Sequence, residues 1–277
     1  MTAPSLTRRV LAGLVLCVAI AGSGGAQETR KPIAPEYGQP GKDVVWVPTS
    51  PALIQKMLDI AEVTAADTVI DLGSGDGRTV IAAAKRGARA KGIEYNPDLV
   101  ELSTATALAE GLADRASFVK ADLFESDFSQ ATVITMFLLT DINLRLRPRL
   151  LDLKPGTRIV SNTFRMGEWE PDETATVEGD CTSWCTALLW VIPAKVEGAW
   201  RLGEGTLTLS QSFQRVSGTL AAGNTSTALV EGRLHGADIR FTIADAAYSG
   251  RVAGDTMSGT VKTGSKTAPW TATRATK

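Results

Sequence analysis

An apolar run, three closely spaced glycines and an alanine-rich run follow one another in VIDLGSGDGRTVIAAAK, residues 69–85. The apolar run is short and rich in β-branched residues, which is typical of a buried strand. The alanine-rich run has the composition of a helix, and Gly87 is suited to end it. The segment therefore predicts a strand, a glycine-rich turn and a helix, which together place bare backbone at a helix N-terminus.

Neighbouring segments extend this unit into a parallel, doubly wound α/β sheet. Ser50 and Pro51 are suited to the N-cap and first position of a preceding helix. Strands alternate with helices along the rest of this region. We expect strands over 88–96, 116–124, 131–139 and 157–164, a helix over 97–111, a short helix within 146–156, and a closing hairpin over 174–179 and 186–194.

The pattern changes near Lys195, after which no helical periodicity is found. Seven short alternating segments follow, and an X-Gly-X-apolar pattern recurs at four glycines, Gly218, Gly236, Gly250 and Gly259. Short strands with glycine-rich turns predict an antiparallel meander that closes into a small barrel or sandwich. A structural module is the favoured interpretation, and a binding module for a polymer or partner is the alternative.

The N-terminus has the pattern of a secretory signal peptide. Arg8 and Arg9 precede an uncharged apolar stretch that reaches about Gly22, and small residues lead to an expected cleavage after Ala26. The mature protein would then be exported, to the periplasm or beyond, and not integral to the membrane. The predicted division is a signal peptide over 1–26, a linker or arm over 27–44, an α/β domain over 45–194 and a β-rich domain over 195–277.

Cysteine and charge content narrow the function classes. The mature chain keeps Cys181 and Cys185 in CTSWC, and a disulfide is the first expectation for an oxidising compartment. A metal site would need more ligands than the single His235 offers, so none is expected. Cleavage would remove two arginines and no acid, lowering the formal net charge from −1 to −3. Since no basic block stands out, a nucleic-acid partner is disfavoured.

Acidic residues around the glycine turn indicate which ligand it serves. The spacing is G-x-G-x-G, not the dinucleotide G-x-G-x-x-G, and Asp71 and Asp76 stand where a pyrophosphate would lie. Carboxylates repel phosphate, so a cofactor with a cationic portion and no phosphate fits better. S-adenosylmethionine is such a cofactor. Glu94 ends the second strand, where it can bind ribose hydroxyls, and Asp122 follows the third, where it can bind the adenine amino group.

VIDLGSGDG, GIEYNPDLV and ADLF resemble the class I, seven-strand methyltransferases that use S-adenosylmethionine. Residues 45–164 are similar to a bacterial group related to the mitochondrial lysine methyltransferases that act on the ring-forming c protein of ATP synthase and the adenine nucleotide translocase. The resemblance implies a Rossmann-like sheet and a set of cofactor-binding residues. These are Pro48, Thr49, Asp71, Gly73, Ser74, Gly75, Gly77, Glu94, Asn96, Asp122 and Leu123.

The methyl acceptor is expected at the end of the fourth strand, between Phe137 and Asp141, because open α/β sheets bind ligands there. FLLTDIN differs from the polar, proline-containing motif of methyltransferases that act on nucleic-acid amino groups, and favours an apolar slot for an alkylamine such as a protein lysine. Asp141 either accepts the proton or caps the next helix. The alternatives are a small-molecule methyltransferase and an exported binding protein without catalysis.

Overall fold

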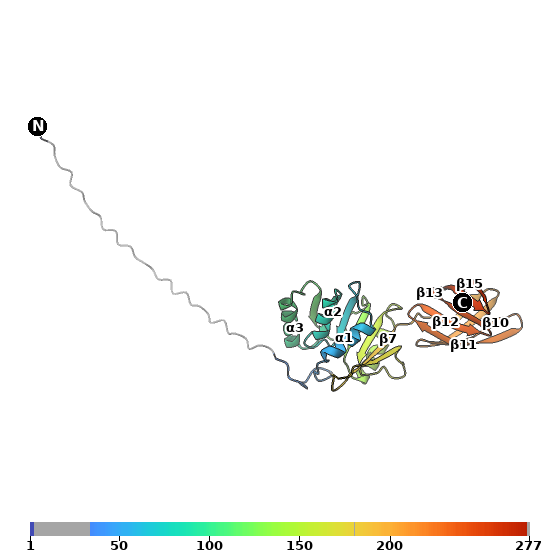
Figure 1. Cartoon of the computed structure of the whole chain (residues 1–277), viewed down its shortest axis with the longest axis horizontal. Coiled ribbons are helices and arrows are strands. Elements are labelled where there is room, and N and C mark those ends of the chain that lie inside the picture. The colour runs from blue at the N-terminus through green and yellow to red at the C-terminus, as the bar shows by residue number, and fades with distance from the viewer. Residues whose placement is uncertain (3–33, 180, 276–277) are drawn as a thin grey trace. The chain divides into compact units, whose positions relative to one another are not determined.

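A computed structural model describes residues 1–2, 34–179 and 181–275. The expected signal peptide, 1–26, lies almost wholly outside the described residues, as do 27–33 of the expected arm. Residues 33–277 form one compact unit. Over the described residues the strands make a seven-stranded sheet and a closed eight-stranded barrel (Figure 1). No helix in the described part of the chain is long and apolar enough to cross a membrane.

The sheet has the strand order β3-β2-β1-β4-β5-β7-β6, which is the doubly wound arrangement that the sequence predicts. Strands β1 to β5 run parallel, and β7 runs antiparallel between β5 and β6. The order reverses between β1 and β4, so a crevice opens at their carboxyl ends. The strands are β1 Thr68–Leu72, β2 Arg89–Glu94, β3 Ala116–Lys120, β4 Val133–Met136, β5 Arg158–Asn162, β6 Glu173–Thr176 and β7 Thr186–Val191.

Helices pack against both faces of this sheet, as the apolar pattern of its strands requires. Buried residues of α1 (Pro51–Ile60) and α2 (Arg78–Lys85) join one face of β1 in a single apolar cluster. Buried residues of α4 (Thr140–Leu150) join the other face. Ser50 caps α1, with its hydroxyl accepting from the Leu53 N–H at 3.3 Å, and Asn96 caps α3 (Pro97–Ala109), as those residue types predict.

The helix that precedes β5 begins earlier than predicted. It covers Thr140–Leu150, whereas the sequence places a short helix within 146–156. Leu139 occupies the N-cap position and makes no side-chain capping bond, so no capping residue marks the start. Pro148 lies inside the last turn, where the sequence pattern suggests a start instead.

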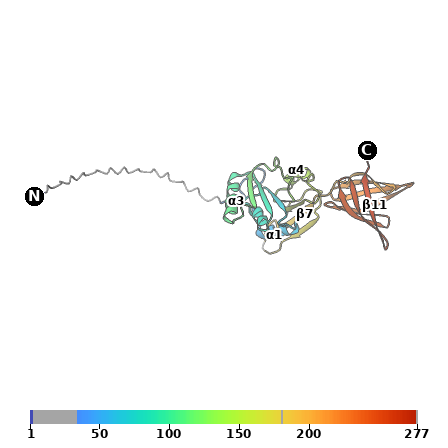
Figure 2. The same ribbon diagram turned by 90° about the horizontal axis from the view of Figure 1, so that it is seen from above.

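The β-rich region is a closed meander, so the barrel alternative is the right one. Figure 2 shows its strands from a second side. The strands are β8 Gly198–Leu202, β9 Gly205–Ser212, β10 Arg215–Ala222, β11 Thr225–His235, β12 Asp238–Ile243, β13 Ala246–Ala253, β14 Thr256–Thr263 and β15 Lys266–Arg274. Of the four recurrent glycines, Gly218, Gly250 and Gly259 lie inside strands, where a Cβ would collide with a neighbouring strand's carbonyl oxygen. They let adjacent backbones approach closely in a small barrel.

Contacts between the sheet domain and the barrel include one ion pair with a buried carboxylate. Arg233 of β11 donates to Asp172 Oδ1 at 2.8 Å, and the other Asp172 oxygen accepts from the Val191 N–H at 2.9 Å. Trp169 stacks on Phe213, with ring centroids 5.5 Å apart. These contacts account for the absence of a free linker between the α/β and β-rich patterns.

We expect a chain that ends after Lys195 to keep its cofactor affinity within about threefold, because the residues that line the cavity at the carboxyl ends of β1, β2 and β4 all precede it. Its solubility should fall, since removing Phe213 uncovers Trp169, which is fully buried in the whole chain. Calorimetric titration with S-adenosylhomocysteine measures the affinity. Loss of binding by a truncated chain that keeps its circular dichroism spectrum would show that the barrel completes the site.

Candidate functional site

A cavity of about 310 Å³ opens at the carboxyl ends of β1, β2 and β4. This is the size range of small-molecule sites. Ten of the eleven predicted cofactor-binding residues line it, and Gly77 does not. The ten are Pro48, Thr49, Asp71, Gly73, Ser74, Gly75, Glu94, Asn96, Asp122 and Leu123.

Asp71 is the most buried charge of the cavity. It lies near the end of β1, is 6% exposed, and accepts a hydrogen bond at its Oδ1 from the Thr135 hydroxyl at 2.7 Å. Burial, opposed by this hydrogen bond and reinforced by the nearby charges of Glu94 and Asp76, raises the pKa of Asp71 to about 7. A carboxylate held in this way is suited to a cationic ligand, because a positive charge would relieve the cost of ionising it.

Glu94 connects the end of β2 to the glycine turn. Its Oε2 accepts from the Gly75 N–H at 2.9 Å, and its Oε1 accepts from the Asn96 N–H at 2.9 Å. Each carboxylate oxygen can accept a second hydrogen bond. Glu94 therefore fixes the turn and still has acceptor capacity toward the cavity. The sequence pattern predicts the second of these roles and gives no sign of the first.

Asp76 is not free to repel a phosphate, which corrects the expectation that both acids of the turn do so. The Arg78 guanidinium donates to both of its carboxylate oxygens, from Nε at 2.9 and 3.0 Å and from Nη2 at 2.6 Å. Arg78 also donates to the Thr49 carbonyl at 3.1 Å. The pair of charges thus ties the segment before α1 to the glycine turn, and Asp71 and Glu94 remain as the carboxylates that disfavour phosphate.

Residues 37–49 form one wall of the cavity, so this part of the expected linker is an ordered arm. Lys42 forms an ion pair with Asp122 Oδ2, while Asp122 Oδ1 accepts from the Phe124 N–H at 2.8 Å. The hydrogen bond from Lys42 lowers the pKa of Asp122 below its usual range. A ligand amino group at Asp122 would share this carboxylate with Lys42. The sequence gives no sign of the pairing, because 80 positions separate the two residues.

The structure places Gly77 and Asp141 away from the cavity. Gly77 has a φ of 80°, and a Cβ there would lie 2.6 Å from Ser103 Cβ and 2.7 Å from the Phe118 ring. Its role is close packing of α2 against its neighbours. Asp141 is exposed in the first turn of α4 and is not among the residues that line the cavity. Its position favours interaction with the helix dipole over proton transfer.

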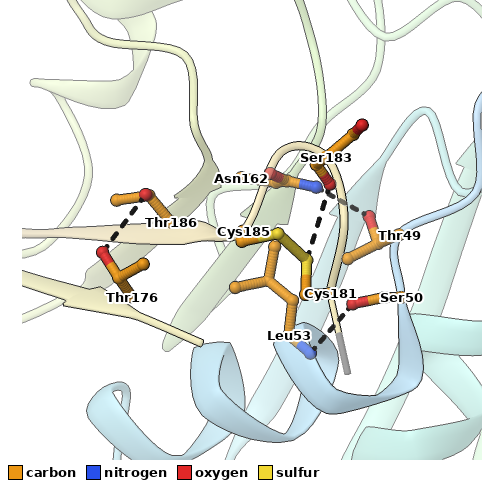
Figure 3. Close-up of a disulfide and its surroundings, with 9 residues drawn as sticks. All are labelled: Thr49, Ser50, Leu53, Asn162, Thr176, Cys181, Ser183, Cys185 and Thr186. Carbon is orange, nitrogen blue, oxygen red and sulfur yellow. Dashed lines mark hydrogen bonds between the residues drawn. A yellow bond between two sulfur atoms is a disulfide. The ribbon is translucent and has the colours of Figure 1, made fainter. Parts of the chain in front are cut away.

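Aromatic side chains line the β4 end of the cavity. Phe137 stacks on Phe164 with ring centroids 5.9 Å apart, and Trp184 approaches Phe137 edge-on at the same separation. We call these three residues the aromatic wall. Cys181 and Cys185 form the expected disulfide, which closes the loop that carries Trp184 (Figure 3). No group of three or more His, Cys, Asp or Glu side chains in the described part is arranged to hold a metal ion.

The residues present fit S-adenosylmethionine. Acids from three neighbouring strand ends, Asp71, Glu94 and Asp122, face one cavity together with the glycine turn. Gly75 has a φ of 53° and is crowded: a Cβ would lie 2.6 Å from Trp46 Nε1 of the arm. The turn and the arm thus approach each other across a backbone that only glycine allows. A cofactor with an ammonium, a ribose and an adenine amino group offers a donor for each of the three acids.

Comparisons with known proteins agree with this geometry. The ANTKMT methyltransferase domain matches residues 71–173. A protein-lysine N-methyltransferase of Saccharolobus islandicus is 46% identical over 138 residues, which are 49% of this chain and 86% of that protein. A lysine N-methyltransferase of Mus musculus, named for the ring-forming c protein of ATP synthase, is 35% identical over 164 residues, 58% of this chain and 66% of that protein.

A solved structure is also similar. It is described as an RNA methyltransferase from Salinibacter ruber in complex with S-adenosyl-L-homocysteine. It is 46% identical with a TM-score of 0.51, and the match covers 54% of this chain and 96% of that one. The cofactor product in that structure supports the same cofactor here. This chain is an S-adenosylmethionine-dependent methyltransferase, and it belongs to the methyltransferase family that includes the protein-lysine N-methyltransferase of Saccharolobus islandicus.

Proposed function

We propose that this methyltransferase acts on the side-chain amine of a protein lysine. The observation that carries the proposal is the apolar, aromatic β4 end of the cavity, which the acids of the glycine turn share. Such a slot admits a slender alkyl chain with a terminal nitrogen. The names of the similar proteins from Saccharolobus and mouse support the same acceptor.

Three carboxylates divide the binding of the cofactor between them. In our proposal Asp71 faces the ammonium of the methionine portion, Glu94 accepts from the ribose hydroxyls, and Asp122 accepts from the adenine amino group, with Leu123 beside the ring. When bound, S-adenosylmethionine supplies an electrophilic methyl group. The protein then contributes positioning, since a displacement requires the acceptor nitrogen and the methyl carbon to be held in line.

The slot can also prepare the acceptor nitrogen. A lysine amine has a pKa of about 10.4 in water and attacks only after it has lost its proton. Among the described residues at the β4 end, Met136 through Leu139, Phe164 and Trp184 line the cavity, and none of them carries a charge. An apolar environment disfavours the ammonium form and lowers the amine pKa. The proton is then released to solvent, and the neutral amine is presented to the methyl group.

We further propose that the enzyme is exported. The basic, apolar and small-residue pattern of residues 1–26 and a disulfide between Cys181 and Cys185 support this location. Disulfides persist mainly in oxidising compartments.

RNA is the second candidate acceptor, because aromatic side chains can stack on a nucleobase and the similar Salinibacter protein is described as an RNA methyltransferase. Charge favours lysine. Lys42 and Arg78, which line the cavity, are already paired with Asp122 and Asp76. The whole chain has a formal net charge of −1. A backbone of phosphates usually requires a basic surface.

A transfer assay on a cell-envelope extract and on total RNA decides between these acceptors. With tritiated S-adenosylmethionine, we expect label in material that protease digests and ribonuclease does not. The control is the Asp71→Asn variant, which removes the charge expected to face the cofactor. Label that ribonuclease releases would assign the enzyme to RNA, and label only in dialysable material would assign it to a small molecule.

Glu94→Ala is expected to weaken S-adenosylhomocysteine binding at least tenfold. Two hydrogen bonds to a charged acceptor contribute about 1.5–3 kcal/mol each when well formed. The variant also loses both bonds that hold the Gly75 and Asn96 N–H groups. Calorimetry measures the change, and NAD should bind to neither protein. Glu101→Ala on α3, which does not line the cavity, is the matched control. Equal affinity of Glu94→Ala and wild type would remove Glu94 from the site.

A further inference from the structure

We propose that the disulfide-closed loop 181–185 is part of the acceptor site, and that it holds Trp184 as the outer member of the aromatic wall that receives the lysine side chain. This inference rests on the proposed function and extends it to the residues that recognise the acceptor. The sequence pattern predicts a structural disulfide between Cys181 and Cys185 and assigns no function to Trp184.

The loop is closed on both sides of Trp184. It connects β6 to β7, and the Val177 N–H donates to the Cys185 carbonyl at 2.9 Å. The disulfide joins Cys181 to Cys185, which directly precedes the first residue of β7. Figure 3 shows this covalent closure, with the Cys181 sulfur directed at the Ser183 carbonyl. Trp184 therefore lies within a short covalent ring anchored to a buried strand.

Trp184 is also held in a conformation that a free loop would rarely keep. Its φ is 53°, in the left-handed region that a bulky residue adopts only under constraint. The side chain is 39% exposed, lines the cavity and contacts the Phe137 ring. A large apolar side chain that is kept partly in solvent at the edge of a cavity is suited to contact a ligand rather than to fill a core.

The inner member of the wall is fixed by a separate device. Thr163, just before Phe164, has a φ of 61°, which is unusual for a β-branched residue. The carbonyl of Phe164 accepts from Asn143 Nδ2 at 3.1 Å and from Ser161 Oγ at 2.8 Å. Strain of this kind persists only where the surroundings enforce it, and it concentrates at binding and catalytic sites. Two strained backbone positions on different segments thus support rings that line the same end of the cavity.

The chemistry of the wall fits a lysine side chain. The methylene stem can lie against the ring faces, which removes apolar surface from water. The ammonium, before it loses its proton, is attracted to an aromatic face by a cation–π interaction. Trp is the residue with the strongest such interaction, and Phe retains part of it. Removing the ring should therefore weaken acceptor binding, whereas the cofactor should bind as before.

The test compares full-length wild type with Trp184→Ala, Trp184→Phe and the Cys181→Ser/Cys185→Ser double variant. The acceptor probe is poly-L-lysine, with tritiated S-adenosylmethionine as donor and S-adenosylhomocysteine calorimetry alongside. We expect Trp184→Ala to raise the acceptor KM about tenfold, with kcat within about threefold and cofactor affinity within about twofold of wild type. Trp184→Phe should recover most of the loss. Leu108→Ala, on exposed α3 surface outside the cavity, is the control.

The double variant separates the disulfide's contribution. Its acceptor KM should rise about as far as that of Trp184→Ala. A phosphine reductant, which adds two electrons and two protons to give two thiols, should raise the wild-type KM and leave the double variant unchanged. An unchanged KM in Trp184→Ala, or equal losses of acceptor and cofactor affinity, would overturn the inference while lysine methylation by wild type stood. Wild type that binds cofactor and labels no lysine would overturn the proposed function and, with it, this inference.

Discussion

Gly75→Val is expected to abolish cofactor binding, with a loss of affinity of at least about 100-fold, while the protein stays folded. Gly75 has a φ of 53°, and a Cβ at this position would lie 2.6 Å from Trp46 Nε1 and 2.9 Å from Trp46 Cδ1. Valine would force either the turn or the arm to move, and the Gly75 N–H that binds Glu94 would move with it. S-adenosylhomocysteine calorimetry measures the affinity, and circular dichroism monitors the fold.

Gly111→Val is the matched control for this experiment. Gly111 has a φ of 69° with nothing within 4 Å of an added Cβ, and it lies outside the cavity. The backbone strain, about 1–2 kcal/mol, is then the same in kind in both variants. Only the collision at the site differs. Cofactor affinity in Gly75→Val equal to that of the control would remove the glycine turn from the binding site.

Asp71→Asn is expected to have opposite effects on binding and stability at pH 8. Without its charge the site should lose roughly 100-fold or more in cofactor affinity, because a charge-assisted contact to the ammonium is removed. The free energy of unfolding should rise, by on the order of a few kcal/mol, because asparagine spares the folded state a buried charge. The Thr135 hydroxyl can still donate to the asparagine oxygen. Urea unfolding and calorimetry measure the two effects.

The pH dependence follows from the raised pKa of Asp71. The folded-state value, about 7, lies above the ordinary value of 3.8. Stability from this group is therefore fully present below about pH 4 and is lost as pH rises through about 7. A cationic ligand prefers the ionised form, so cofactor binding near pH 6 should release close to one proton, and near pH 8.5 almost none. Calorimetry in buffers of different ionisation enthalpy detects this. Proton release unchanged in Asp71→Asn would contradict the assignment.

The sequence predicts the sheet domain well because its signals are local. Ser50 and Asn96 are capping residues at the helix starts that they predict, and Asp71 and Glu94 lie at the ends of strands whose β-branched or apolar runs are easily read. Parallel strands then bring such ends to one edge of the sheet. The carboxylates that meet in the cavity are therefore foreseeable without any knowledge of side-chain contacts.

The contacts that close the cavity are not local, and the sequence gives little sign of them. Lys42 meets Asp122, and Trp46 covers Gly75, only because the arm folds back over the sheet. The constraint on Thr163 is a backbone conformation that its residue type disfavours, so sequence patterns do not reveal it. Arg78 is an exception: its position two residues after Asp76 makes a local ion pair foreseeable. Charges inside a glycine turn have to be read together with their neighbours.

The most direct test of lysine methylation is to identify the methylated atom. Poly-L-lysine incubated with the full-length enzyme and tritiated S-adenosylmethionine is hydrolysed in acid, and the labelled amino acid is separated by chromatography. We predict that the label elutes with Nε-methylated lysine standards and that Asp71→Asn transfers almost none. Absence of labelled lysine from protein that binds S-adenosylhomocysteine, with methylated nucleosides recovered from RNA under the same conditions, would contradict it.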